Sequence, residues 1–153
     1  MANLQTPMSN FKVEGNIVDI TKRNIFFGEV EVEAGKIKAV RKIAAAKDET
    51  YFILPGFIDS HVHIESSMLI PSEFARLAVT HGTVATISDP HEIANVCGMA
   101  GVEFMIENGN TVPFKFNFGA PSCVPATVFE TAGAELNHDD VNAIGTPGDQ
   151  IPE

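Results

Sequence analysis

The part of the sequence that decides the fold reads Leu54-Pro55-Gly56-Phe57-Ile58-Asp59-Ser60-His61-Val62-His63-Ile64-Glu65-Ser66-Ser67-Met68. It is a short apolar run with β-branched and aromatic residues, and its entry through Pro-Gly favours a buried strand. Side chains two positions apart on a strand point to the same face, so His61 and His63 would face one point. Two imidazoles that converge at a strand end can bind one divalent cation. The stretch therefore predicts the beginning of a metal site.

The composition is that of a globular domain with an acidic surface. The chain has 153 residues, 44% hydrophobic and 20% charged, which is enough for one domain with a core. Its formal net charge is −10, from 20 acidic and 10 basic residues. This balance argues against nucleic acid or an anionic membrane as the partner.

Targeting signals and cysteine motifs are sparse. The first ten residues lack a basic region followed by an apolar core, and no run approaches ~18 apolar residues. Neither a signal peptide nor a membrane span is therefore predicted. Cys97 and Cys123 are too few for a disulfide framework, and no CxxC pair is present. The expected location is the cytoplasm.

Residues 11–52 show the pattern of short antiparallel strands. Glu29-Val30-Glu31-Val32-Glu33 alternates strictly, Ala34-Gly35 turns the chain, and Lys36-Ile37-Lys38-Ala39-Val40 alternates again. The pattern predicts a hairpin with one buried face. Residues 41–50 are polar and rich in Ala and Lys, which predicts a connection on the surface.

After residue 51 the sequence alternates between strand and helix signals. Strands are predicted over residues 52–59, 83–88 and 114–118. A helix is predicted to begin at Pro71 and to end at Gly82. Strands that alternate with helices in this way predict a parallel sheet with helical crossovers.

The helix before the third strand carries the clearest end signals. Asp89 fits the N-cap, Pro90 fits the first turn, and Glu92 fits a capping-box partner. Gly109 marks the end of this helix. Its predicted buried face is one apolar stripe of Ile93, Val96, Cys97, Ala100, Phe104 and Met105.

Capping explains two of the polar residues at the start of this helix without any function. His91 is different, because a cap needs no imidazole. It follows the second strand of the predicted parallel sheet, so it is a candidate for binding or proton transfer. For His61 and His63, the alternative to a metal site is a pair of strand-end histidines without a ligand.

Three motifs, in order along the chain, resemble one enzyme family. They are His61-Val62-His63-Ile64-Glu65-Ser66-Ser67-Met68, Asp89-Pro90-His91-Glu92-Ile93 and Ser122-Cys123-Val124-Pro125-Ala126. The first motif, preceded by Pro-Gly-Phe-Ile-Asp, looks like the first barrel strand of the amidohydrolase superfamily. The three motifs together resemble the bacterial adenine deaminases of that superfamily, over residues 50–136.

The resemblance implies an α/β fold, namely the N-terminal portion of a metal-dependent (β/α)₈ amidohydrolase barrel after a small β-sandwich segment. Residues 11–52 would form the β-sandwich segment, residues 53–136 the first βα units, and residues 137–153 a loosely ordered tail. A helix could begin near His138. A complete barrel needs ~250 residues and eight strands, whereas about three βα units are expected here. We therefore expect an N-terminal part of such an enzyme that is inactive alone.

The resemblance also implies a reaction, in which metal-activated hydroxide attacks C6 of adenine to give hypoxanthine and ammonia. The cofactor would be a divalent metal, binuclear in the family, with Mn or Fe expected and Zn as a further option. His61 and His63 would be metal ligands, and His91 and Glu65 would be catalytic. The expected substrate-binding residues are Ser66, Ser67, Asp89, Glu92 and Ser122. The partner would be a purine base, and the assembly a homo-oligomer.

Two other functions stay open on the sequence. Another amidohydrolase, such as a cyclic-amide hydrolase or a deacetylase, shares the His-x-His pattern, although the motifs at residues 65–67 and 89–92 resemble adenine deaminases instead. A cytidine-type zinc deaminase is disfavoured because no PCxxC motif is present. Outside the enzymes, the alternative is a self-associating, metal-binding fragment, whose unpaired strands would leave edges for a second copy.

Overall fold

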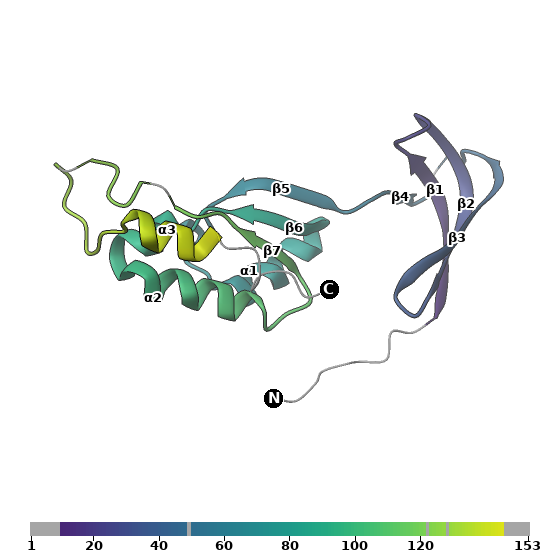
Figure 1. Ribbon diagram of the computed structural model, residues 1–153. Coiled ribbons are helices and arrows are strands. Elements are labelled where there is room, and N and C mark those ends of the chain that lie inside the picture. Colours follow the sequence, from purple (N-terminus) through teal and green to yellow (C-terminus); the bar gives the residue numbers. More distant parts are fainter. Residues whose placement is uncertain (1–9, 49, 122, 128, 146–153) are drawn as a thin grey trace. The chain divides into compact units, whose positions relative to one another are not determined.

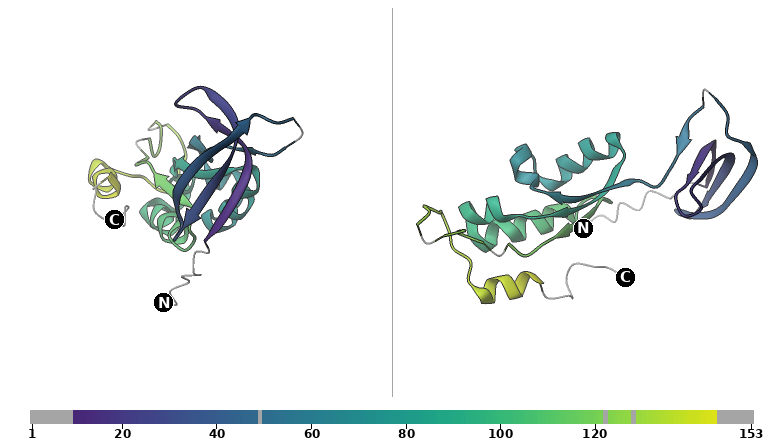
Figure 2. Two further views of the ribbon diagram at one scale, coloured as in Figure 1. Left: turned by 90° about the vertical axis from the view of Figure 1, so that its right-hand side faces the viewer. Right: turned by 90° about the horizontal axis from the view of Figure 1, so that it is seen from above.

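The computed structural model describes residues 10–48, 50–121, 123–127 and 129–145, and the chain divides into two units (Figure 1 and Figure 2). The division lies between Pro55 and Gly56, whereas the sequence predicts it between residues 52 and 53. Among the described residues, no helix is both long enough and apolar enough to span a membrane.

The first unit is one four-stranded sheet with the order β3-β2-β1-β4. Its strands are β1 (Phe11–Asp19), β2 (Asn24–Glu33), β3 (Lys36–Ala45) and β4 (Phe52–Ile53). The first three strands pair antiparallel, and β4 pairs parallel with β1. The predicted hairpin is present, with Ala34 and Gly35 at positive φ in its turn. Because one sheet is described, the β-sandwich stays a prediction.

Burial in the first unit is concentrated on β1 and β2. Ile17, Phe27 and Val30 are buried, whereas most of β3 is exposed, including Ile37 and Ile43. The buried face predicted for the hairpin is therefore confined to β2. The surface connection predicted for residues 41–50 is wrong in its first half, because β3 continues to Ala45 and pairs there with Phe26.

Asn16 fixes the chain that leads from β3 to β4. It is 2% exposed, its Nδ2 donates to the Lys47 carbonyl at 2.7 Å, and its Oδ1 accepts from the Lys47 N–H at 2.9 Å. Its backbone N–H donates to the Tyr51 carbonyl at 2.8 Å. An amide side chain can pair with a peptide group in both directions. It therefore holds a segment that has no strand of its own.

The second unit is built on a parallel sheet with the order β5-β6-β7. Its strands are β5 (Phe57–Val62), β6 (Thr83–Ser88) and β7 (Lys115–Phe118). The first crossover holds the short 3-10 helices η1 (Ile64–Ser67) and η2 (Val79–His81) around α1 (Pro71–Ala78), and the second is α2 (His91–Gly109). The mixed α/β class and the parallel crossovers predicted from sequence are thus present. Closure into an eight-stranded barrel stays a prediction.

Helices pack together on one side of this sheet. α1 contacts α2, α2 contacts β7, and Figure 1 shows α2 below the strands. A third helix, α3 (His138–Gly145), adds Ile144 to the core cluster of Ala94, Val102 and Val124.

The helix that the sequence allows near His138 is present as α3, so the loose order predicted for residues 137–153 does not hold at the beginning of that segment, and a capping box stabilises the helix. Asn137 Oδ1 accepts from the N–H groups of Asp139 (2.7 Å) and Asp140 (3.2 Å), and Asp140 Oδ2 accepts from Asn137 N at 2.9 Å. Buried Ile144 then anchors the helix. Residues 146–153 lie outside the described residues.

The single strand predicted over residues 52–59 is wrong, because Pro55-Gly56 separates β4 from β5 and the two strands lie in different sheets. The burial predicted for this stretch is also wrong. Phe57 and Ile58 are 57% and 64% exposed, since β5 is an edge strand with one neighbour among the described residues.

The buried face predicted for α2 is mostly wrong. The buried residues of this helix are Ala94, Gly98, Gly101, Val102, Met105 and Gly109, while Cys97, predicted to be in the core, is exposed. The reason is Gly98, whose φ of 62° and ψ of −149° interrupt the helix. An interruption resets the helical period, so residues before and after it do not share one face.

Candidate metal centre

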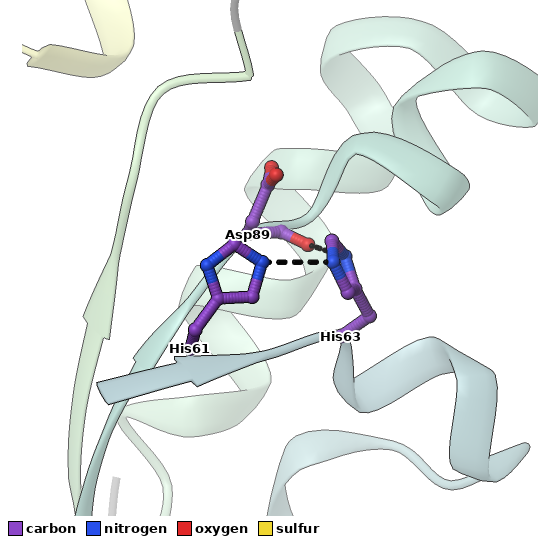
Figure 3. Close-up of side chains that lie close together, drawn as sticks. All are labelled: His61, His63 and Asp89. Carbon is purple, nitrogen blue, oxygen red and sulfur yellow. Dashed lines mark hydrogen bonds between the residues drawn. The ribbon is translucent and has the colours of Figure 1, made fainter. Parts of the chain in front are cut away.

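His61 and His63 converge at the carboxyl end of β5. His61 is in the strand and His63 directly follows it, and Figure 3 shows the two rings turned toward each other. Their Nε2 atoms are 3.2 Å apart. The period-two spacing of the sequence thus produces the predicted convergence, and the same-face rule for strands is its cause.

The orientation of His63 is set by the neighbouring strand. Its Nδ1 lies 2.9 Å from the backbone carbonyl of Asp89, the residue that follows β6 (Figure 3). A carbonyl only accepts, so the proton is on Nδ1 and the Nε2 lone pair is directed toward His61. Asp89 N donates in turn to the Val62 carbonyl at 3.0 Å, which joins the two strand ends.

Only one of the two carboxylate oxygens of Asp89 makes a hydrogen bond among the described residues. Its Oδ2 lies 3.0 Å from Nδ1 of His91, while its Oδ1 is buried and has no hydrogen-bond partner among the described residues. A buried carboxylate oxygen without a partner is costly unless a cation or a donor compensates it. One ligand atom each of His61, His63 and Asp89 lies within 4.8 Å of the others. A carboxylate oxygen of Asp89 therefore lies near two imidazoles, and the same carboxylate keeps one oxygen without a partner among the described residues, an arrangement that a cation would complete.

The spacing and chemistry of these donors fit a divalent metal. Two nitrogens bound at ~2.0–2.1 Å to one ion lie roughly 2.8–3.0 Å apart at octahedral angles and ~3.3–3.4 Å apart at tetrahedral angles. The observed separation of 3.2 Å lies between these values. Imidazole and carboxylate ligands suit Zn, Fe and Mn alike. The donor set therefore fits a metal without selecting one.

A second group of donors, namely His63, His91 and Glu92, also lies within 4.8 Å. Both carboxylate oxygens of Glu92 already accept from Ser66 Oγ at 2.7 Å. The Nδ1 atoms of the two histidines are each engaged by Asp89. The group that contains His61 is therefore the better candidate for a metal centre.

Residues of η1 reach across to the beginning of α2. Glu65 Oε1 accepts from the backbone N–H of Ile93 at 3.1 Å, and Ser66 Oγ donates to Glu92. Ser67 instead donates within its own turn, to the Ile64 carbonyl at 2.5 Å. Two of the three polar residues of η1 therefore contact the first turn of α2, which also carries His91.

The caps predicted for α2 are wrong. The helix begins at His91 with Pro90 as its N-cap, and no side chain at the cap position makes a capping bond. Asp89 orients His91 instead of capping, and Glu92 bonds Ser66 instead of closing a capping box. Ser66 of η1, distant in sequence, thus competes successfully for Glu92, and neighbouring His91 does so for Asp89.

Comparison with known proteins agrees with this geometry. Residues 52–146 match the amidohydrolase family. The chain belongs to the amidohydrolase family. Adenine deaminases of Sulfurovum sp. and Salinibacter ruber are 59% and 56% identical to it, over 133 and 136 residues. The adenine deaminase of Methanothermobacter thermautotrophicus is 56% identical over 124 residues.

These matches cover 87%, 89% and 81% of this amidohydrolase chain, and 25%, 25% and 23% of the three relatives. The chain thus spans about a quarter of the length of the curated relatives it matches. Membership of the amidohydrolase family follows from these matches.

Most of the site residues predicted for this amidohydrolase chain lie together at the carboxyl ends of β5 and β6. They are His61, His63, Glu65, Ser66, Ser67, Asp89, His91 and Glu92. Ser122 lies outside the described residues, so its predicted role is untested.

The sequence did not identify Asp89 as a candidate metal ligand, or the buried hydroxyl pair of Thr86 and Ser88, whose Oγ atoms are 2.9 Å apart. The register between β5 and β6 is the feature that could have identified Asp89. Ser88 pairs with Val62, so the residue after Ser88 lies beside His63.

Proposed function

We propose that this chain carries part of the metal centre of an adenine deaminase, which converts adenine and water to hypoxanthine and ammonia. The observation that carries the proposal is the convergence of His61 and His63 near the carboxylate of Asp89, one oxygen of which has no partner among the described residues. The substrate is proposed from the relatives, whose printed names are adenine deaminase. Since the chain spans a quarter of their length, the activity is proposed for the whole enzyme.

His61 and His63 would hold a divalent cation, and Asp89 would be a third donor. Mn or Fe is the proposed metal, with Zn as the alternative, in a binuclear centre whose further ligands lie beyond the strands described. A bound divalent cation supplies Lewis-acid activation of water, whose pKa falls from ~15.7 toward ~7. The chain's own contribution is to orient the donors, through the bond between His63 and the Asp89 carbonyl.

His91 is the proposed group for proton transfer. Its Nδ1 is held by Asp89 Oδ2 at 3.0 Å, which orients the ring and fixes Nε2 as the atom that exchanges protons with water or the base. The centroid of the His91 ring lies 4.6 Å from the centroid of the His63 ring, so His91 is adjacent to the proposed metal. Glu65 stays a second candidate for catalysis.

The proposed contacts to the base are polar side chains at the same strand ends. They are Ser66, Ser67, Asp89, Glu92 and Ser122. Hydroxyl and carboxylate groups complement the ring nitrogens and the exocyclic amine of a purine. We also propose a cytoplasmic homo-oligomer that binds neither nucleic acid nor membrane. The net charge of −10 supports the proposal that neither nucleic acid nor membrane is a partner. The exposed apolar residues Phe57 and Ile58 support self-association.

A chimera tests the proposed function. This chain would replace the matching 133-residue segment of the Sulfurovum relative, and hypoxanthine and ammonia would be measured with adenine and Mn²⁺. We expect activity of the same order as that of the parent. The H61N and H63N variants should abolish it, whereas H81N should not, because His81 is exposed at the end of η2.

A chimera that folds and binds Mn²⁺ but leaves adenine unchanged would contradict the proposal. Hydrolysis of a cyclic amide by the same chimera would favour the other amidohydrolases, which the relatives do not support. The chain on its own is expected to release no ammonia from adenine, because two histidines and one carboxylate do not define a two-metal centre.

A further inference from the structure

The first turn of α2 is capped by a residue from another loop. Pro90, at the N-cap position, has no side-chain acceptor, and Glu65 Oε1 accepts from the N–H of Ile93 at 3.1 Å. Ile93 is the third residue of the helix, and its N–H is one that an N-cap side chain ordinarily binds. The negative charge of Glu65 also matches the positive end of the helix dipole. Glu65 therefore performs the role of an N-cap from 28 residues away.

A second contact joins the same two segments. Ser66 Oγ lies 2.7 Å from both carboxylate oxygens of Glu92, which is also in the first turn of α2. These contacts involve adjacent residues on each side, so η1 and the beginning of α2 are held by two hydrogen bonds. Two parallel bonds restrict rotation as well as separation of the segments.

This connection determines the environment of His63. His63 directly precedes η1, and Asp89 lies just before α2. The bond between His63 Nδ1 and the Asp89 carbonyl, at 2.9 Å, spans the same gap as the contacts of Glu65 and Ser66. The bond from Asp89 N to the Val62 carbonyl holds Asp89 on the strand side, at 3.0 Å, and the first turn of α2 holds it on the other side. If that turn moved away from η1, the Asp89 carbonyl would lose its alignment with Nδ1, and the acceptor that fixes the tautomer of His63 would be weakened.

We propose that Glu65 is a positioning residue for His63. By capping α2 from η1, it holds the Asp89 carbonyl against Nδ1 and so keeps Nε2 of His63 as the nitrogen directed toward His61. The inference rests on the metal-binding role of His63 in the proposed function, and it assigns to Glu65 a task other than catalysis. The loss of a hydrogen-bond partner behind a metal-ligating histidine lowers metal affinity by about 10–100-fold.

Glu65→Ala and Glu65→Gln separate positioning from proton transfer. Glutamine keeps an oxygen that can accept from Ile93 but has no carboxylate, so it preserves the cap and removes any acid–base role. The tautomer of His63 is read by long-range ¹H–¹⁵N NMR on the metal-free chain, and Co²⁺ affinity by titration of the visible absorption. Glu73→Ala is the matched control, because Glu73 is a carboxylate of α1 that pairs with Arg76.

For Glu65→Ala we expect a mixture of the two His63 tautomers and a Co²⁺ affinity about 10–100-fold weaker. Glu65→Gln and Glu73→Ala should keep the Nδ1–H tautomer and an affinity close to that of the parent chain. Ser66→Ala removes the second contact more gently and should shift both measurements in the same direction, so it replaces Glu65→Ala if that variant does not fold.

The parent tautomer and affinity in Glu65→Ala and Ser66→Ala would overturn the proposal. So would a Glu65→Gln variant as impaired as Glu65→Ala, because a cap needs only the acceptor oxygen. The tautomer is measured without metal or adenine, so the result stands even if the chimera shows no deaminase activity. Failure of the proposed function and failure of this inference are therefore distinguishable.

Discussion

In the first unit, β1 pairs with β2 and β2 pairs with β3 through tight turns, whereas β5, β6 and β7 of the second unit pair across helical crossovers. Neighbouring strands joined by short turns are antiparallel, and their side chains meet in pairs along the sheet. Parallel strands bring all their carboxyl ends to one edge. The parallel sheet of the second unit therefore brings residues that are distant in sequence to one edge, whereas the antiparallel hairpins of the first unit do not.

The charged groups of the two units reflect this difference. In the first unit, Arg41 pairs with Glu29 at 2.9 Å and with Glu31 at 2.6 Å, and Lys12 adds a further pair with Glu29. Oε2 of Glu31 is buried and makes no hydrogen bond of regular geometry among the described residues, but this ion pair with Arg41 compensates its charge. In the second unit, the Asp89 carboxylate keeps one buried oxygen without a partner among the described residues. Satisfied pairs on a surface stabilise a sheet modestly, while an unsatisfied buried group points to a ligand.

The largest expected effect concerns the imidazoles of the second unit. His61→Ala or His63→Ala should weaken Co²⁺ or Zn²⁺ binding by more than the ~10–100-fold that follows the loss of a ligand's hydrogen-bond partner, because a ligand itself is removed. Titration of the Co²⁺ absorption measures the loss. His81→Ala is the control, and an equal loss in that variant would show that the metal binds elsewhere.

The next effect tests how helix α3 is anchored. Ile144→Ala should lower the free energy of unfolding of the second unit by about 2–5 kcal/mol, because Ile144 is 7% exposed and belongs to the core cluster. Urea unfolding measures the change. Val96→Ala, at a position of α2 that is 67% exposed, should change little. A larger loss of unfolding free energy in Val96→Ala than in Ile144→Ala would instead support the apolar stripe predicted from sequence.

A smaller effect is expected from Gly28→Ala in the first unit. The added carbon would lie 2.4 Å from the Arg41 carbonyl and 2.8 Å from Cδ1 of Ile17, so the strand pair must shift. The expected cost is about 1–3 kcal/mol in the free energy of unfolding. In Gly119→Ala the added carbon lies at an ordinary 3.7 Å from the Ser88 carbonyl, and thermal unfolding of that variant should match the parent.

The smallest effect is the pH dependence of the exposed ion pairs. The hydrogen bond from Arg41 lowers the pKa of Glu31 below its ordinary 4.5, so its stabilisation is present above pH 4.5 and is lost as pH falls through the lowered pKa. Arg41→Gln should therefore lower the melting temperature slightly at pH 7 and not at all in strong acid. Added salt should also reduce the difference. A difference that grows toward low pH would contradict this origin.

Local patterns in the sequence predicted the elements of both units. The alternation of residues 29–40 gave the hairpin, and the spacing of His61 and His63 gave their convergence. The parallel crossovers also followed from the order of strand and helix signals. These features depend on backbone periodicity, which each segment carries by itself.

Features that depend on competition between segments were not predictable. Asp89 is of a residue type that is typical of an N-cap, yet its carboxylate contacts His91, and Glu65 supplies the cap. The face of α2 could not be derived, because a glycine within a helix does not reveal whether it will adopt a positive φ. The position of Ile144 in the core depends on a contact with α2 that no local pattern contains.

The buried amide of Asn16 has a consequence for the chemical lifetime of the molecule. Hydrolysis of that amide to aspartate would replace the Nδ2 donor by an oxygen that faces the Lys47 carbonyl, 2.7 Å from Nδ2 in the intact protein. Two acceptors would then oppose each other in a site that is 2% exposed. Deamidation of this one side chain would therefore release the segment that leads to β4, without any change in the encoded sequence.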